Sequence, residues 1–211
     1  MGKTRVAVLA SGRGTDFQSI IDAYERGELP IDLALLVVNN KDAKAIDRAK
    51  KHGIDWLYID HRGKTRKEFE EEVVQAMKSR NIDLVVLAGF MRIVTGHLIS
   101  HYPHRIMNIH PTLLPAFPGA HGHRDVLAHG VKVSGCTIHF VDESLDGGPI
   151  ILQKAVEVQD DDTEQTLEER VLKEEHKLLP LAVKLFAEGR LKVEGRHVKI
   201  DRRGMQLPPM A

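Results

Sequence analysis

The sequence predicts an α/β fold in which a mostly parallel, twisted sheet carries helices on both faces and an antiparallel C-terminal extension. Three observations predict it. In the first 90 residues, short apolar and β-branched runs alternate with stretches of helical periodicity. Buried strands that alternate with helices are typical of parallel sheets with right-handed crossovers. Beyond Gly89, two longer β runs flank a turn-forming segment, which favours antiparallel pairing.

The N-terminal residues predict a strand, a glycine turn and a capped helix. Residues 6–10 form a short apolar run that ends in Ser-Gly-Arg-Gly, which is typical of a buried strand and a turn. Thr15 and Gln18 have the spacing of a capping box. Apolar side chains then recur at helical intervals until Gly27, a residue that often ends a helix.

The same signals place the remaining elements. Within the first half, strands are predicted over 33–38, 56–59 and 84–88, and helices over 43–51 and 67–78. A strand over 104–109 comes next, and then β runs over 131–141 and 150–158. We expect a long helix over 164–187 with a kink at Pro180, a hairpin over 191–200 and a loose tail at 207–209. No internal repeat or linker interrupts this order, so one domain is expected.

Composition excludes several classes of protein. The 211 residues include 30 basic and 30 acidic side chains, so the formal net charge is zero and we expect no nucleic-acid partner. The single cysteine, Cys136, excludes an intramolecular disulfide and a multi-cysteine zinc site. Since no apolar run reaches membrane-spanning length and no signal peptide is evident, we expect a soluble, cytoplasmic protein with no membrane partner.

Histidine is concentrated in one window. Of the 12 histidines, eight lie between positions 97 and 139: His97, His101, His104, His110, His121, His123, His129 and His139. Because the pKa of an ordinary histidine lies nearest to physiological pH, this window is where chemistry is expected.

Asn108 and His110 form the first candidate constellation. They stand two residues apart near a predicted strand end, so both side chains leave the same face. The ends of parallel strands are where α/β proteins bind ligands. An amide and an imidazole aimed at one point could donate hydrogen bonds to an oxygen that gains charge. The proline-rich loop that follows favours this interpretation over a purely structural strand end.

Asp146 permits two interpretations. An Asp-Gly pair is a common hairpin signal, so Asp146 could serve the turn alone. It could instead pair with His110, hold the ring protonated and fix its tautomer. A metal site built from His110, His121, His123 and Asp146 is a further alternative. No established zinc-ligand spacing supports that site, so we predict no metal.

The turn around Gly12 and Gly14 matches no complete nucleotide-binding motif. Phe17 replaces the third glycine of the dinucleotide fingerprint, and Asn39 and Asn40 stand where a ribose-binding acid is expected. The Walker A motif is absent as well. A glycine turn that leads into a helix can still bind one phosphate, and a structural tight turn explains it equally well.

Five motifs occur together in one order over essentially the whole chain: Ser11-Gly12-Arg13-Gly14, residues 87–93, Asn108-Ile109-His110-Pro111, residues 113–119 and residues 145–149. In this order they resemble the phosphoribosylglycinamide formyltransferase family. Asn-x-His with a downstream Asp is shared by the wider formyltransferase superfamily. The Phe-Pro-Gly and His-x-His-Arg segments and the short chain are more specific for the glycinamide branch.

The resemblance implies a Rossmann-like fold and a reaction. A formyl group would pass from 10-formyltetrahydrofolate to the amine of glycinamide ribonucleotide in purine biosynthesis, with no metal. Asn108 and a protonated His110 would stabilise the tetrahedral oxyanion, with His110 as proton donor and Asp146 holding it charged and oriented. Residues 1–100 would bind the phosphate, residues 101–211 would bind folate and carry catalysis, and the protein would be a monomer or homodimer.

The resemblance also implies two sets of binding residues. The ribonucleotide set is Gly14, Thr15, Asp16, Leu172, Lys173, Glu174 and Glu175, with Glu175 on the ribose hydroxyls. The folate set is Arg66, Met91, Arg92, Ile93, Val94, Asn108, Asp142, Glu143, Ser144, Leu145 and Asp146. The family often has Asn where this chain has Asp16, and a carboxylate beside a phosphate is unfavourable unless it turns away.

Three other functions compete with formyl transfer to the ribonucleotide. Formyltetrahydrofolate deformylase, a hydrolase, shares the Asn, His and Asp but has an N-terminal regulatory domain. Methionyl-tRNA formyltransferase carries a C-terminal domain and needs a basic tRNA-binding face. A non-catalytic nucleotide-phosphate binding module would not need the three candidate catalytic residues. The first strand is expected within the first ten residues, which disfavours the deformylase. The zero net charge disfavours the tRNA-dependent enzyme, and the presence of Asn108, His110 and Asp146 disfavours a binding module.

Overall fold

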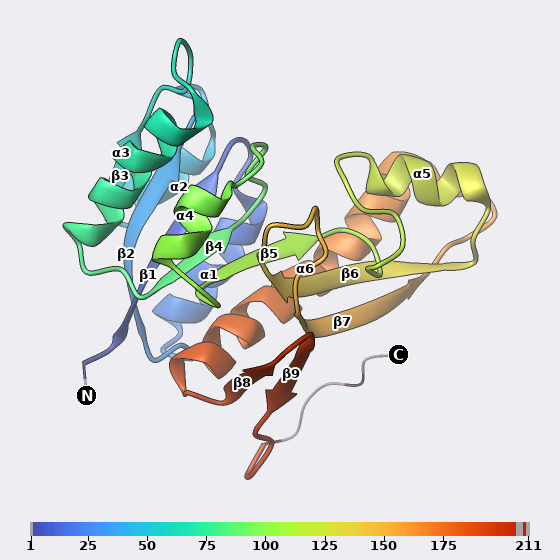
Figure 1. The fold of residues 1–211 in the computed structure, drawn as a ribbon. Helices are drawn as coiled ribbons and strands as arrows, with labels where there is room; N and C mark the ends of the chain where they lie inside the picture. The colour runs from blue at the N-terminus through green and yellow to red at the C-terminus, as the bar shows by residue number, and fades with distance from the viewer. Residues whose placement is uncertain (1, 206–208, 210–211) are drawn as a thin grey trace. The chain divides into compact units, whose positions relative to one another are not determined.

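The structure is a computed structural model that describes residues 2–205 and 209. The chain forms two compact units, Met1–Asn108 and Ile109–Ala211, and each is described by itself (Figure 1). Among the described residues, no helix is both long enough and apolar enough to cross a membrane.

The first unit is built on a parallel sheet. Its strands are β1 (Thr4–Ala10), β2 (Ile31–Val38), β3 (Trp56–Tyr58), β4 (Leu84–Leu87) and the start of β5 (Ile106–His110). They lie in the order β3-β2-β1-β4-β5, and every pair is parallel. The predicted parallel sheet is therefore confirmed for this part of the chain.

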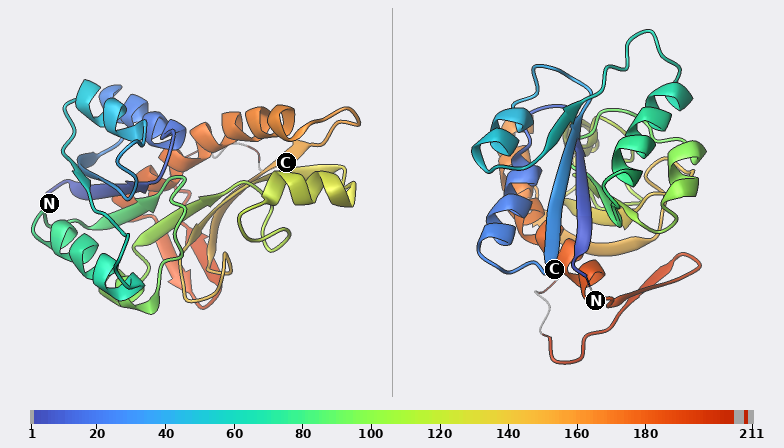
Figure 2. Two further views of the ribbon diagram at one scale, coloured as in Figure 1. Left: turned by 90° about the horizontal axis from the view of Figure 1, so that it is seen from above. Right: turned by 90° about the vertical axis from the view of Figure 1, so that its left-hand side faces the viewer.

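Helices cover both faces of this sheet. They are α1 (Thr15–Glu25), α2 (Ala45–Lys51), α3 (Arg66–Lys78) and α4 (Gly96–His101). Figure 2 shows α1 and α2 on one face of the strands and α3 and α4 on the other. Coverage from both sides explains why β1 is a continuous apolar run: its last five residues are completely buried.

The second unit contains the antiparallel extension. Strands β6 (Val133–Phe140) and β7 (Ile150–Glu157) pair antiparallel, and so do β8 (Leu191–Glu194) and β9 (His197–Ile200). The order is β6-β7-β9-β8. The backbones of β6 and β7 approach closely at Gly135, where a Cβ atom would overlap the carbonyl oxygen of Lys154.

Two helices complete the second unit. They are α5 (Gly122–His129) and α6 (Glu164–Ala187), and α6 packs against β6 and β7. The predicted bounds of α6 are confirmed, and the helix runs without interruption through Pro180. Thr163 caps its N-terminus by accepting a hydrogen bond from the backbone of Thr166.

One local prediction is wrong, and two helices were not predicted. Gly14, in the left-handed conformation, is the N-cap residue of α1 and Thr15 is its first helical residue, so Thr15 and Gln18 form no capping box. Glycine avoids the steric cost of this conformation, which is why the turn can end one residue earlier than predicted.

The six residues of α4 and the eight of α5 are too few to show a clear helical period. Residues 207 and 208 of the predicted tail lie outside the described residues.

Thr65 provides a test of helix capping. Its hydroxyl accepts from the amide of Glu68, and the Glu68 carboxylate accepts from the amide of Thr65. We expect Thr65→Ala to lower the free energy of unfolding by about 1 kcal/mol. Thr15→Ala, at the start of a helix without a side-chain cap, should change it by less than about 0.5 kcal/mol. Urea denaturation measures both, and equal losses would contradict the assignment of caps.

Candidate active site

Strand β5 positions Asn108 and His110. Both residues lie within Ile106–His110, and their spacing of two places both side chains on one face of the strand. Asn108 is partly exposed, whereas His110 retains only 4% of its surface. A polar pair at the carboxyl end of a parallel strand is therefore present as predicted.

The ring of His110 faces two hydrogen-bond acceptors. Its Nε2 lies 2.9 Å from the carbonyl oxygen of Phe117, and its Nδ1 lies 3.6 Å from the carboxylate of Asp146. A carbonyl and a carboxylate can only accept hydrogen bonds. Nε2 can therefore donate to the Phe117 carbonyl, while Nδ1 lies within ion-pair range of the carboxylate but beyond hydrogen-bond distance.

Asp146 lies in a turn that the neighbouring glycines shape. Its own backbone is left-handed, with φ of 49°, a conformation that Asp adopts more readily than most residues. A Cβ atom on Gly148 would overlap the carbonyl oxygen of Phe140, so the turn requires glycine there. The Asp146 carboxylate accepts from the amide of Gly119 at 2.8 Å. The turn therefore directs this carboxylate towards both the 111–119 loop and His110.

A second histidine, His139, faces the same carboxylate. Its Nε2 lies 3.9 Å from Asp146 Oδ1, and its Nδ1 lies 2.9 Å from the carbonyl oxygen of Phe140. Burial lowers the pKa of His139, and the nearby Asp146 only partly opposes this effect. Sequence reasoning missed its place beside Asp146, although a histidine inside a predicted strand was an available signal.

His123 is partly buried. Burial lowers its pKa, while Glu164 and Glu168 on α6 act in the opposite direction. His121 is exposed. Within the part of the chain that the structure describes, no group of three or more His, Cys, Asp or Glu side chains is placed to hold a metal ion.

The Gly12–Gly14 turn packs against α2. The amide of Ala45 donates to the carbonyl oxygen of Gly12 at 3.1 Å. A Cβ atom on Gly14, whose φ is 67°, would lie 2.7 Å from the Cβ of Ala45. No side chain caps the first amides of α1, which leaves this helix end available to an anion.

Asp16 stands beside this helix end. Burial raises its pKa to about 6, and the positive charge of Arg13 opposes the shift. Thr15 and Asp16 are both partly exposed. With a pKa of about 6, the Asp16 carboxyl group is mostly ionised at pH 7 and becomes protonated as the pH falls through 6.

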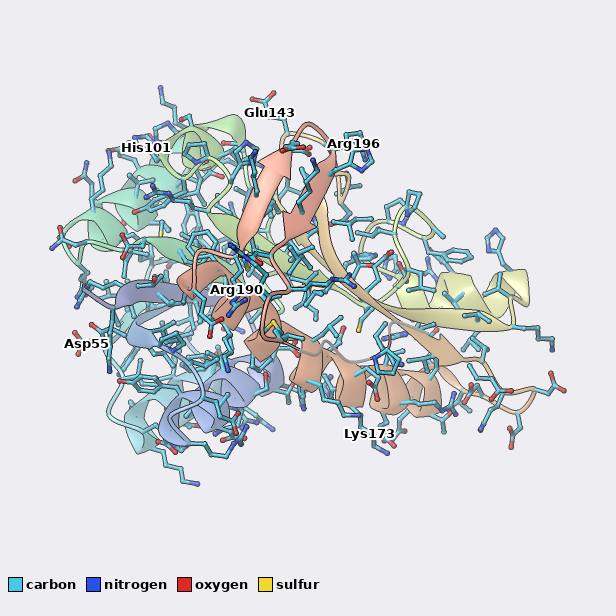
Figure 3. All side chains as sticks on the ribbon, turned by 90° about the horizontal axis from the view of Figure 1, so that it is seen from below. Asp55, His101, Glu143, Lys173, Arg190 and Arg196 are labelled. Carbon is cyan, nitrogen blue, oxygen red and sulfur yellow. The ribbon has the colours of Figure 1, made fainter. Side chains whose placement is uncertain are left out.

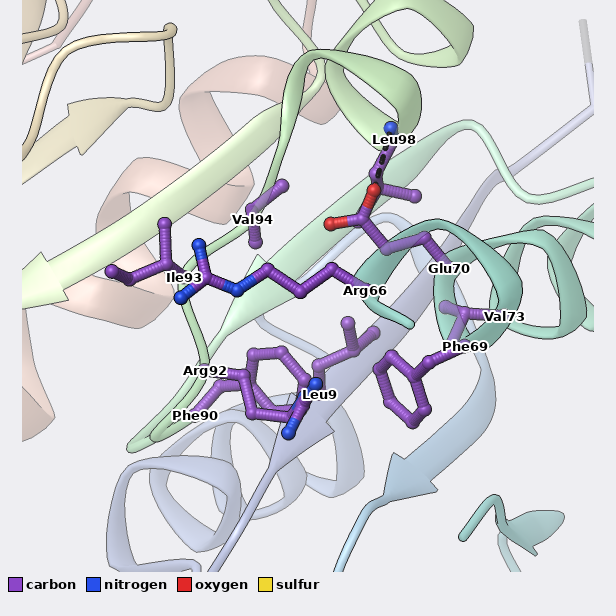
Figure 4. Close-up of a pocket in the computed structure, with 10 residues that line it drawn as sticks. All are labelled: Leu9, Arg66, Phe69, Glu70, Val73, Phe90, Arg92, Ile93, Val94 and Leu98. Carbon is purple, nitrogen blue, oxygen red and sulfur yellow. Dashed lines mark hydrogen bonds between the residues drawn. The ribbon is translucent and has the colours of Figure 1, made fainter. Parts of the chain in front are cut away.

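Four residues of the predicted folate set line one pit in the first unit: Arg66, Arg92, Ile93 and Val94 (Figure 4). The enclosed space is about 10 Å³, which is enough for a single water molecule. Met91 and Ile93 expose 76% and 58% of their surface.

The remaining predicted residues occupy two segments of the second unit. In the 142–146 segment, Asp142 accepts hydrogen bonds from the amide and hydroxyl of Ser144, while Glu143 and Leu145 are exposed. Arg196 on the β8–β9 hairpin donates to the carbonyl oxygen of Gly147 at 2.9 Å and so holds the residue that follows this segment.

The second segment is part of α6. Lys173 projects into solvent (Figure 3), Leu172 and Glu174 are partly exposed, and Glu174 pairs with Lys177 at 2.7 Å. Glu175 is buried, with 7% of its surface exposed. Lys173 and Glu175 thus have opposite environments, so they are not equivalent as candidate ligands.

The family model described as formyl transferase matches residues 4–183. The chain is 40% identical to phosphoribosylglycinamide formyltransferase of Escherichia coli over 97% of this chain and 96% of that protein. It is 41% identical to the human trifunctional purine biosynthetic protein adenosine-3 over 94% of this chain, but it spans only about a fifth of that protein's length.

Solved structures of related enzymes resemble this chain as well. The glycinamide ribonucleotide transformylase 1 of Symbiobacterium toebii superposes with a TM-score of 0.93 at 46% identity, covering 94% of each chain. A formyltetrahydrofolate deformylase from Pseudomonas syringae gives 0.88 at 28% identity, covering 94% of this chain and 66% of the other. The α/β fold predicted from the sequence is confirmed.

The raised pKa of Asp16 predicts a pH-dependent gain on neutralisation. The group has an ordinary pKa of 3.8 when unfolded, so between about pH 4 and pH 6 the folded state binds more protons and loses stability as pH rises. We expect Asp16→Asn to be more stable than the parent at about pH 8, by on the order of 2 kcal/mol. The difference should vanish below about pH 4.

Urea denaturation of Asp16→Asn and the parent, at about pH 8 and at a pH below about 4, measures the difference in the free energy of unfolding. Asp22→Asn, on the exposed side of the same helix, is the matched control. A gain from Asp16→Asn that is equal at both pH values would contradict burial as its cause.

Proposed function

Because the chain belongs to the formyl transferase family, we propose that it transfers a formyl group from 10-formyltetrahydrofolate to the amine of glycinamide ribonucleotide. The observation that carries the proposal is the His110 ring, which faces the Asp146 carboxylate with one nitrogen and a carbonyl oxygen with the other. A protonated ring held in this way is suited to an oxygen that becomes negative during the reaction.

The chemistry follows from this ring. The substrate amine attacks the formyl carbon, and the carbonyl oxygen becomes the oxyanion of a tetrahedral intermediate. Asn108 and His110 stabilise that oxygen by donating hydrogen bonds. The bond from carbon to the folate nitrogen then breaks, the folate nitrogen gains a proton, and the amine nitrogen loses one. In this structure the Phe117 carbonyl occupies the position on Nε2 that the formyl oxygen would take.

Asp146 and His139 surround one side of the His110 ring. The Asp146 carboxylate lies 3.6 Å from Nδ1 and is placed to orient the ring. His139, whose pKa is lowered by burial, contributes a largely neutral neighbour near neutral pH. We assign Asp146 as the residue that holds His110, and His139 as a group that packs against the same carboxylate.

The ribonucleotide would bind through two sets of groups. The uncapped amides at the start of α1, at Gly14, Thr15 and Asp16, suit a phosphate. On α6, residues 172–175 are the second set, with the buried Glu175 for the ribose hydroxyls. Lys173 projects into solvent and is the weakest member of this set.

The folate would bind through apolar and polar groups of the predicted set. Among the described residues, Met91, Ile93 and Leu145 are three of the four large apolar side chains that are strongly exposed. A contiguous apolar patch formed by such side chains would suit an apolar part of the ligand. Asp142, Glu143 and Ser144 would supply the polar contacts of the same ligand.

The proposal also covers the setting of the reaction. Both substrates are small molecules, and the proposed reaction uses no metal. We infer a cytoplasmic enzyme of purine biosynthesis, a monomer or homodimer. Residues 1–100 bind the phosphate, and residues 101–211 carry catalysis and bind the folate together with Arg66 and residues 91–94. The other activities of the trifunctional relatives are not part of this proposal.

A single assay tests the function. The protein is incubated with 10-formyltetrahydrofolate with and without glycinamide ribonucleotide, and formylated ribonucleotide, tetrahydrofolate and formate are measured. We expect product only when the ribonucleotide is present, and a loss of at least about 1,000-fold in kcat for His110→Ala with an unchanged Kd for the ribonucleotide.

His197→Ala, on the exposed strand β9, is the control and should retain activity. Formate release without ribonucleotide would identify a hydrolase, and binding without any product would identify a binding module. Near-normal turnover by His110→Ala would remove this residue from the mechanism.

The role of Asp146 can be separated from its role in the turn. Asn keeps the shape, tolerates the left-handed backbone and can still accept from Gly119, so Asp146→Asn should change the free energy of unfolding by less than about 1 kcal/mol. The lost charge should lower kcat at neutral pH by at least about 100-fold.

Paired thermal melts and initial rates decide between the two roles. Asp160→Asn, which removes an exposed carboxylate paired with Lys132, is the matched control. An unchanged kcat in Asp146→Asn would show that Asp146 serves the turn alone, because Asn preserves the turn but not the charge.

A further inference from the structure

The segment between β4 and α4 has an unusual combination of properties. Residues 90–95 form no helix or strand, yet Met91 and Ile93 are held with most of their surface exposed. An irregular segment has few internal hydrogen bonds to fix its shape. Its conformation must therefore depend on neighbouring elements.

Glu70 on α3 holds the C-terminal end of this segment. The side chain is buried, with 4% of its surface exposed. Its carboxylate accepts hydrogen bonds from the amide of Thr95 at 2.7 Å, the hydroxyl of Thr95 at 2.5 Å and the amide of Leu98 at 3.2 Å. The carboxylate thus satisfies two backbone donors where the segment enters α4, and these donors would otherwise be buried without acceptors.

The preceding residue of α3 holds the middle of the segment. The ring of Phe69 stacks on Phe90 with centroids 6.4 Å apart, and the Arg92 guanidinium lies 4.9 Å from its centre. In Figure 4 the side chain of Glu70 extends towards Leu98 and that of Phe69 points away from it, and both line the pit together with Arg92 and Val94. Consecutive residues of one helix therefore contact successive parts of the segment.

Ser11 holds the N-terminal end. Its hydroxyl accepts from the amide of Met91 at 2.8 Å and donates to Asn39 at 2.6 Å, and its own amide donates to the carbonyl oxygen of Gly89 at 3.1 Å. Because its single proton goes to Asn39, a lone pair remains for the Met91 amide. Ser11 thereby joins the segment to the turn at the end of β1.

We propose that Glu70 and Ser11 are positioning residues that fix residues 91–94 in the conformation that binds the formyl folate. The inference rests on the proposed function, since residues 91–94 belong to its folate set. In this proposal neither Glu70 nor Ser11 contacts the folate. Each holds the backbone of the segment, and residues 91–94 of that segment contact the ligand. Fixing a binding segment in advance reduces the entropy lost when the ligand binds.

Glu70→Gln tests the inference. A glutamine presents one oxygen and one NH₂ group, so its NH₂ group would face a backbone donor in either orientation. We expect the Kd of 10-formyltetrahydrofolate, measured by calorimetry without ribonucleotide, to rise at least about tenfold. The Kd of glycinamide ribonucleotide should stay within about twofold, and kcat at saturating folate within about threefold, because His110 is unaffected.

Glu71→Gln is the matched control. Glu71 is the next residue of α3 and also reaches α4, but it is exposed and contacts only the side chain of His97 there. Its three constants should stay within about twofold of the parent. Ser11→Ala gives a second test, with an expected rise in folate Kd of at least about fivefold that does not depend on whether Glu70→Gln folds.

The outcomes are distinguishable. Unchanged folate binding by Glu70→Gln and Ser11→Ala in a protein that binds folate would overturn the inference and leave the proposed function intact. Equal losses for both substrates would overturn it as well, because they would indicate general destabilisation. No folate binding by the unaltered protein would overturn the proposed function and the inference with it.

Discussion

The Asp146 carboxylate is the group on which the geometry of the second unit depends. Its side chain is only 14% exposed, and removing a charge from water costs several kcal/mol unless partners offset it. The partners are the amide of Gly119 and the rings of His110 and His139. They come from a loop and two different strands, so one charge brings together segments that are distant in the sequence. The left-handed turn and the obligatory glycine at 148 are the backbone conditions for that placement.

In the first unit, too, side chains with little exposed surface hold an irregular segment in place, but the groups they hold are backbone amides. Buried acceptors on regular elements, Glu70 on α3 and Ser11 at the end of β1, satisfy backbone amides of an irregular segment. A helix or strand is rigid because its own hydrogen bonds fix it, whereas a loop needs outside acceptors to have one shape. In both units a polar side chain with little exposed surface therefore fixes a segment that is proposed to bind substrate.

The sequence predicted most of the fold because the fold depends on periodicity. Continuous apolar runs and helical stripes identified β1, β4 and α6, which are long or fully buried. The prediction failed at Gly14, where a left-handed residue replaces the expected side-chain cap. Asn108 and His110 were visible as candidates because they lie two residues apart on one strand. The Phe117 carbonyl and Gly119 amide were not, because backbone groups leave no residue signature and their partners are 7 and 27 residues away.

The surroundings of His110 also limit the class of chemistry. Thr112 is buried and donates its hydroxyl to the carbonyl oxygens of Ala116 and Phe117, so it is committed to the loop. Cys136 is fully buried in β6. Within the described residues, the ring's own partners are a carbonyl and a carboxylate, and it activates no hydroxyl or thiol. Nε2 faces a carbonyl oxygen, to which it can only donate, and in the proposed function the substrate amine supplies the nucleophile. Asn108, His110 and Asp146 would serve an attacking amine and an attacking water equally well. The distinction between transferase and hydrolase therefore lies in the residues that bind the ribonucleotide, because a bound amine excludes water from the formyl carbon.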